Sequence, residues 1–95
     1  MTKLHKIETV AAAAKTLRVL AHPVRMKVTE FLADGEKNVG TIQKHIKQVQ
    51  AVTSQHLKIL LDNGLVNKRR DKNFIYYRQN TKVLKGIGQL INDIS

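Results

Sequence analysis

The pattern in the middle of the chain restricts the possible folds most strongly. Aliphatic side chains recur at helical spacing in residues 41–47 and again in residues 50–62, with a break between them. Gly64 follows the second pattern, at the place where a helix commonly ends on a left-handed residue. Two predicted strands come next around a turn at residues 71–73: the basic segment 66–70 and the segment 74–78, whose residues 74–77 have strong β preference. The predicted order is helix, turn, helix and β-hairpin.

Further helices are expected on both sides of this stretch. Apolar residues fall at helical spacing in residues 4–20 and in residues 82–95, the latter after a capping pair at 80–81. Pro23 suits the first position of another helix, because its fixed φ is already helical. That helix is expected to stop near Gly35.

A short extended link at residues 38–40 separates this helix from the next, which Thr41 is expected to cap. A chain of 95 residues is most simply one domain, here residues 1–95. The expected fold is mainly α with a small β-hairpin, the arrangement of a winged helix-turn-helix. The strand pair would form the wing.

The charge of the chain is strongly positive and unevenly placed. The net charge is +10, from 17 basic and 7 acidic residues, and residues 37–85 hold 11 Lys or Arg against only Asp62 and Asp71. A field of this sign attracts polyanions such as DNA, RNA or an acidic membrane. A basic surface can serve solubility alone, but here the charge concentrates on the predicted helix-turn-helix. Double-stranded DNA is therefore the expected partner.

Several classes of function are disfavoured by what the sequence lacks. It has no cysteine, which removes disulfides, thiolate metal sites and thiol redox switches. It has no apolar run of bilayer length and no apolar core of a signal peptide near its start, so a cytoplasmic location is expected and no membrane partner. No nucleophile–base pair, paired carboxylates or Gly-rich phosphate loop is present, so an enzyme is not expected.

The second helix of the central pair is expected to read base edges. Gln55 offers a donor and an acceptor that match adenine, and Ser54 adapts to either kind of partner. Thr53 also falls on the apolar stripe of this helix. The residues expected to face DNA from this helix are Gln50, Ala51, Thr53, Ser54, Gln55, His56 and Lys58. An ordinary solvated helix face is the alternative for Ser54 and Gln55. Thr41 and Lys44 of the preceding helix are expected to anchor the phosphate backbone.

The hairpin carries a basic run that suits contact with phosphates or with the minor groove. The residues expected to make these contacts are Lys68, Arg69, Arg70 and Lys72. Charges on an edge strand also prevent aggregation, and both roles can hold together. Tyr76 and Tyr77 alternate faces, so one is expected in the core and the other toward DNA or a second subunit.

The first and last helices are more apolar than a small monomer requires. They are expected to pair within a subunit and across a two-fold axis, because reading a palindrome needs two identical units. Completion of a monomer core is the alternative. The residues expected at the dimer contact are Leu4, Ile7, Ala11, Ala14, Ile87, Leu90, Ile91 and Ile94.

Three motifs in this order resemble one known family. Residues 20–26 read Leu-Ala-His-Pro-Val-Arg-Met, and residues 54–60 read Ser-Gln-His-Leu-Lys-Ile-Leu with Gly-Leu-Val at 64–66. A wing-like segment from Arg69 to Tyr77 follows. This pattern is similar to that of the ArsR/SmtB family of dimeric winged-helix repressors. The resemblance implies a homodimer on an imperfect inverted repeat, released when an inducer binds.

The chain departs from that family where many members bind metals. The start of the third helix lacks the cysteine motif, and the last helix holds no histidine and only Asp93 as an acid. His5 with Asp93 across a dimer interface is conceivable, but two groups do not make a tight site. No metal and no cofactor is therefore expected, and the inducer is not identified. The usual turn glycine of the wing is also replaced, and Asn73 is expected to take the positive φ.

Three histidines other than His5 are open to more than one interpretation. His56 is expected to pack beside its helix or to bond a phosphate, and His22 to take part in capping. His45 is expected either to touch DNA when protonated or to be an idle surface residue.

The sequence favours a sequence-specific DNA-binding repressor over two alternatives. A basic RNA-binding module usually presents aromatic stacking platforms, and this chain has just four aromatic residues. A winged-helix domain kept only for protein contacts would not need the acid-free stretch from Lys37 to Leu61.

Overall fold

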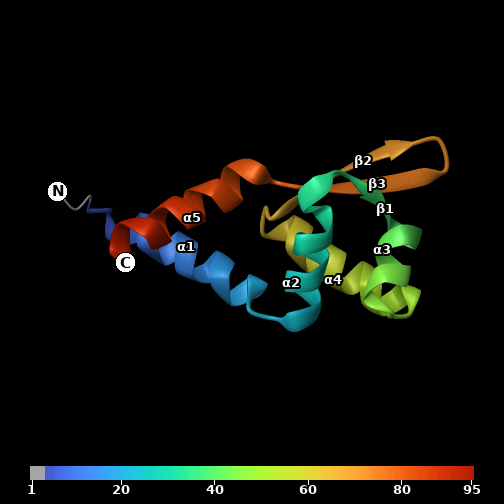
Figure 1. Ribbon diagram of the computed structural model, residues 1–95, viewed down its shortest axis with the longest axis horizontal. Helices are drawn as coiled ribbons and strands as arrows, with labels where there is room; N and C mark the ends of the chain where they lie inside the picture. The colour runs from blue at the N-terminus through green and yellow to red at the C-terminus, as the bar shows by residue number, and fades with distance from the viewer. Residues whose placement is uncertain (1–3) are drawn as a thin grey trace.

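A computed structural model describes residues 4–95 and contains six helical segments and three strands (Figure 1). The N-terminal start of the predicted domain, residues 1–3, lies outside the described residues. In chain order the elements are α1 (Ile7–Leu20), α2 (Pro23–Phe31), a 3₁₀ turn η1 (Leu32–Asp34), β1 (Lys37–Asn38), α3 (Val39–Ile46), α4 (Gln50–Asp62), β2 (Val66–Asp71), β3 (Phe74–Gln79) and α5 (Thr81–Ile94). The sheet is antiparallel with strand order β1-β3-β2. This is the predicted winged helix-turn-helix, with β1 as a third strand beside the hairpin.

The molecule is elongated, 49 × 23 × 20 Å, because two of its helices leave the main body (Figure 1). Helices α1 and α5 lie side by side and form an arm at one end. The β2–β3 hairpin projects at the opposite end, above α3 and α4. The arm and the wing are therefore at the two ends of one subunit.

Local capping explains where α2 and α3 begin. His22 Nδ1 accepts a hydrogen bond from the Val24 amide at 3.2 Å, so His22 caps α2 as expected. The cap of α3 is Asn38, whose Oδ1 accepts the Thr41 amide at 2.8 Å. The prediction that Thr41 is this cap is wrong. Asn38 is the last residue held extended by pairing with β3, so the helix starts directly after it, at Val39.

Three residues with positive φ shape the turns around the second helix of the pair and the wing. Lys47 (φ 56°) ends α3 and Gly64 (φ 73°) follows α4, the latter as predicted. The wing turn places its positive φ at Lys72 (φ 54°) and not at Asn73. In a two-residue turn between Asp71 and Phe74, Lys72 is the first turn residue, and this position takes the left-handed conformation.

One apolar core joins α2, α3, α4 and the base of the hairpin. Its buried members are Val28, Leu32, Ile42, Ile46, Leu57, Leu60, Leu65, Val66 and Tyr77. Thr53 is also buried with 0% exposure, and its hydroxyl donates to the Val49 carbonyl at 3.0 Å. The inner face of α4 is thus fixed in the core, and this leaves its outer face directed away from the core.

The arm is only partly covered. Ile87 and Leu90 of α5 are buried within the subunit itself, whereas Leu4, Ile7, Ile91 and Ile94 remain exposed. His5 Nε2 lies 2.8 Å from Asp93 Oδ2 and ties the start of α1 to the end of α5. These two groups, considered above as metal ligands across a dimer interface, form a pair inside one chain.

Candidate nucleic-acid interface

A groove of about 430 Å³ separates the wing from the N-terminal halves of α3 and α4. Amide and hydroxyl side chains from several elements line it: Asn38 of β1, Gln43 of α3, Gln50 and Ser54 of α4, and Asn73 of the wing turn. Ile75 and Tyr77 of β3 form its floor on the hairpin side. Donors and acceptors on two helices and a hairpin tip thus converge on one open surface, which is the arrangement that groove recognition requires.

Gln43 and Asn73 are two residues of this groove that were not predicted from the sequence. Gln43 sits on a helix expected to have a supporting role, and Asn73 was expected only to adopt a special backbone conformation. No local signal distinguishes either residue, because the packing of the hairpin over α3 is what brings them beside α4.

The outer face of α4 presents most of the residues predicted there. Gln50, Ala51, Ser54, Gln55 and Lys58 are all exposed. Lys58 Nζ forms an ion pair with Asp62 Oδ2 at 2.8 Å, and this hydrogen bond raises the pKa of the lysine. The lysine therefore stays charged, with its field partly offset by a carboxylate one turn away.

Two residues of the predicted set do not belong to this face. The prediction that Thr53 faces DNA is wrong: its place on the apolar stripe of α4 buries this side chain in the core. His56 is half-buried between α4 and the start of α2, with its ring 4.7 Å from that of His22. Arg25 Nε donates to His56 Nδ1 at 3.4 Å. His56 thus packs beside its helix, the first of the two roles considered for it.

The environment of His56 favours its neutral form. Burial lowers the pKa of this imidazole, and the nearby His22 and Arg25 lower it further. A neutral ring accepts the Arg25 hydrogen bond without repulsion. The second helix of the pair therefore rests on α2 through a contact that depends on an uncharged histidine.

The supporting helix α3 exposes Thr41 and Lys44, as predicted. The Thr41 hydroxyl already donates to Asn38 Oδ1 at 3.0 Å. His45 stacks on the Phe31 ring, with centroids 3.8 Å apart and planes 7° from parallel. This stacking is a packing role that the sequence did not predict for His45, and its contact with DNA stays a prediction.

The cations of the wing divide between the two faces of the hairpin. Lys68 pairs with Tyr77 and Arg70 with Ile75, so both lie on the face that lines the groove. Arg69 pairs with Tyr76 on the opposite face. Cross-strand partners share a face, and successive residues alternate. The basic run is therefore not a single contact surface.

Arg69 is held away from the groove by its own partners. Its guanidinium forms a double hydrogen bond with the Glu36 carboxylate, including Nε to Oε2 at 2.9 Å, and lies 4.7 Å from the centre of the Tyr76 ring. The pair raises the pKa of Arg69 and lowers that of Glu36. On the other strand face Tyr77 is buried, and burial raises the pKa of its hydroxyl. The two tyrosines thus point to opposite faces, as predicted, with Tyr77 the core member.

Within residues 4–95 no three His, Asp or Glu side chains come together in a way that could hold a metal ion. Over the same residues, no helix combines the length and the apolar character needed to cross a bilayer.

Residues 22–68 match the family model described as "Bacterial regulatory protein, arsR family". The chain is 33% identical over 79 residues to the arsenical resistance operon repressor of Staphylococcus aureus, covering 83% of this chain and 76% of that protein. It is 38% identical over 65 residues to the biofilm growth-associated repressor of Xylella fastidiosa, covering 68% of this chain but only 57% of that longer relative.

Solved structures give the same family resemblance. NolR from Sinorhizobium fredii superposes with a TM-score of 0.74 at 34% identity, covering 95% of this chain and 93% of that one. The homodimeric winged helix-turn-helix domain Mb0332 from Mycobacterium bovis superposes with a TM-score of 0.70 at 29% identity, covering 92% of this chain and 81% of that one.

Proposed function

Since this chain belongs to the arsR family of bacterial regulatory proteins, we propose that it is a cytoplasmic transcriptional repressor that binds duplex DNA as a homodimer. The observation that carries the proposal is the groove between α4 and the wing. It places the polar side chains of α4 and two wing cations on one side of the molecule. An enzyme is not indicated by any feature of the site.

In this proposal α4 lies in the major groove, and Gln50, Ser54 and Gln55 meet base edges. Glutamine can bond adenine N6 and N7 together, which discriminates against the other bases by roughly 1–3 kcal/mol. Lys44 and Lys58 are exposed beside them and reach the phosphates. Lys68, Arg70 and Lys72 carry the wing to the neighbouring phosphates or minor groove.

In this proposal the arm is the surface through which a second subunit binds. Leu4, Ile7, Ile91 and Ile94 expose apolar side chains that the subunit itself does not cover, with Leu4 87% and Ile94 74% exposed. Ala11 and Ala14 allow a second helix to approach α1 closely. A two-fold axis through the arm would set the two α4 helices on half-sites one turn of DNA, about 34–36 Å, apart. Ile87 and Leu90, expected at the same contact, support it from within the subunit.

The aromatic residues favour duplex DNA over single-stranded RNA. His45 covers Phe31, Tyr77 is buried, and the Arg69 guanidinium covers Tyr76. Among the residues that the structure describes, Phe74 at the wing tip is the one broadly exposed aromatic ring, at 56%. A stacking platform for successive bases needs more than one exposed ring.

The proposal is tested by titrating the purified chain against a labelled duplex from its own upstream region. We expect footprinting to show a protected inverted repeat, and Gln55→Ala to change the preference at a single base position by roughly 1–3 kcal/mol. Binding that is equally tight to random duplex, or that disappears for all sequences alike in Gln55→Ala, would reject base reading by α4.

The homodimer is tested separately with Ile91→Glu. A buried carboxylate at a two-fold contact is costly, so we expect this variant to sediment as a monomer and to bind a full operator more weakly. The matched control is Asn92→Glu, which places the same charge on the next, polar position of α5. An equal response of both variants would show that the exposed apolar stripe is not the contact.

A further inference from the structure

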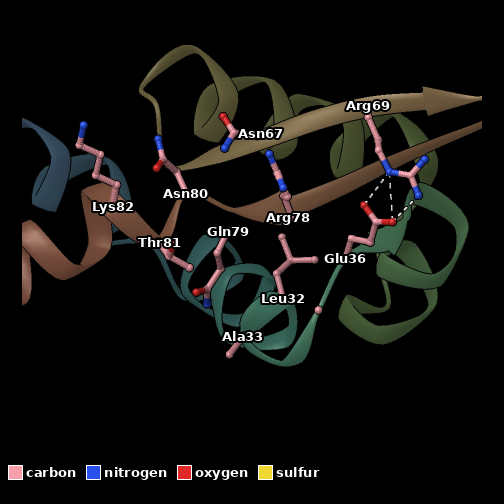
Figure 2. Close-up of a pocket in the computed structure, with 11 residues that line it drawn as sticks. Leu32, Ala33, Glu36, Asn67, Arg69, Arg78, Gln79, Asn80, Thr81 and Lys82 are labelled. Carbon is pink, nitrogen blue, oxygen red and sulfur yellow. Dashed lines mark hydrogen bonds and ion pairs between the residues drawn. The ribbon is translucent and has the colours of Figure 1, made fainter.

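A larger cavity, about 620 Å³, opens on the other face of the hairpin (Figure 2). It lies between the base of the wing, η1 and the start of α5. Asn67 and Arg78, which are partners across β2 and β3, form one wall. Lys82 of α5 lies at one end of the cavity and the Arg69–Glu36 pair at the other (Figure 2).

The lining of this cavity is positively charged. Arg69 and Glu36 neutralise each other through their double hydrogen bond. Arg78 and Lys82 add two cations, and neither forms an ion pair with another residue in the range 4–95. The positive end of the 14-residue helix α5 adds to the same potential. The field of Arg78 reaches Glu36, where it contributes to the lowered pKa of that carboxyl.

Two other polar side chains around the cavity are already engaged in holding the fold. Gln79 Nε2 donates to the Thr29 carbonyl at 2.6 Å, and Asn80 Nδ2 donates to the Gly64 carbonyl at 2.8 Å. These bonds fix the strand end and the start of α5 on either side of the opening. The side chains that remain for a ligand are the guanidinium of Arg78, the ammonium of Lys82, the amide of Asn67 and the hydroxyl of Thr81, and each of these can donate a hydrogen bond.

The groove for DNA does not use this cavity. Asn67 and Arg78 point to the face of the hairpin opposite Lys68 and Tyr77, since neighbouring residues of a strand alternate. A duplex seated between α4 and the wing would leave the cavity open on the far side of the sheet. Its cations are thus not explained by the proposed contact with DNA.

We propose that this cavity is an effector site for a small anionic molecule bearing a phosphate or carboxylate group. Arg78 binds the oxyanion through two parallel hydrogen bonds, and Lys82 adds a point charge. The inference rests on the proposed function in one respect: the cavity walls belong to both the wing and the arm. A ligand that favours one relative placement of these two parts changes the affinity for the operator.

Binding is measured on the full chain without DNA, by calorimetry and by amide chemical shifts. Inorganic phosphate and malonate are titrated separately, with sodium chloride at matched ionic strength as the reference, so the two oxyanion sources are distinguished. We expect saturable binding of at least one of them, with shifts at residues 67, 78 and 82. Arg78→Gln and Lys82→Gln should each weaken it about tenfold or more.

The matched control is Lys85→Gln, which removes an exposed α5 lysine that does not line the cavity. Its affinity for the anion should stay within about twofold of the unaltered chain, because screened charges beyond the first contact contribute little. An equal loss in Lys85→Gln, or no saturable binding in the unaltered chain, overturns the site. Since no DNA is present, that result leaves the proposed repressor function standing.

The proposed effect of the anion on DNA binding is tested by measuring operator affinity with and without the anion at constant ionic strength. A change of affinity that disappears in Arg78→Gln supports an effector site. Anion binding with unchanged operator affinity overturns its role as an effector.

Discussion

The division of the wing cations between two faces makes a quantitative prediction about Arg70 and Arg69. Arg70 shares the face of Ile75 toward the groove, whereas Arg69 is bound to Glu36 on the opposite face. Arg70→Gln should therefore remove one phosphate contact per subunit, and Arg69→Gln none. The slope of log affinity against log salt is negative, and its magnitude decreases by about 0.9 for each phosphate that a cation no longer neutralises, or by about 1.8 for a dimer.

That difference in slope is large enough to measure. When the salt concentration rises fourfold, the affinity for DNA should decrease more for the unaltered dimer than for Arg70→Gln. The change in slope makes the first decrease about 12 times larger than the second. Fluorescence anisotropy with a labelled operator from about 50 to 200 mM salt covers this range. Circular dichroism melts check that each variant folds, because an exposed ion pair such as Arg69–Glu36 adds little to stability.

A third variant tests whether the ion pair with Glu36 keeps Arg69 away from DNA. Glu36→Gln releases Arg69 from its carboxylate and removes one negative charge. It should bind DNA at least as tightly as the unaltered chain. Identical salt slopes for Arg69→Gln and Arg70→Gln would refute the assignment of these side chains to different faces.

Three further predictions concern stability. Thr53→Ala, which deletes a buried methyl group and a hydroxyl bonded to a main-chain carbonyl, should lower the free energy of unfolding by about 1–2 kcal/mol in urea titrations, with no such decrease for exposed Ser54→Ala. His56 has its pKa lowered in the folded state by burial, His22 and Arg25, so its contribution to stability should be fully present above its ordinary pKa of 6.5 and should disappear as pH falls through the folded-state pKa. His56→Gln should flatten this pH dependence in thermal melts; an unchanged profile would exclude His56 as its source. Lys47→Gly should raise the free energy of unfolding by about 0.5–1 kcal/mol, because Lys47 holds a left-handed conformation at the end of α3 that glycine adopts without strain; a decrease would mean that the lysine side chain makes a compensating contact.

The order of elements was predictable because it depends on local signals. Helical spacing, Pro23 after a capping His22, and Gly64 at the end of α4 each act within a few residues. The errors at this level are small shifts. Thr41 was expected as a cap in place of Asn38, because the pairing of β1 with distant β3 that extends Asn38 leaves no mark in the neighbouring sequence.

The contents of the site depended more on packing between distant segments. Periodicity alone placed Thr53 both on the apolar stripe and on the reading face, and burial in the core resolved this. The basic run at 68–70 was predicted to form one surface, yet Glu36, 33 residues before Arg69, binds its middle member. The presence of Gln43 beside α4, and the cavity around Arg78, likewise needed contacts between residues far apart in the chain.

Three motifs carried the resemblance to the family, whereas spacing, turn residues and charge were enough to define the winged architecture and its positive surface. Those properties follow from backbone preferences and from a count of charges, both of which are local or additive. Other features follow from strand register and from the packing of α4 and the start of α5 beside the base of the hairpin: the cation that faces the groove, the polar residue that is buried and the position of the second cavity. These depend on the simultaneous packing of side chains from several elements, and no single segment encodes them.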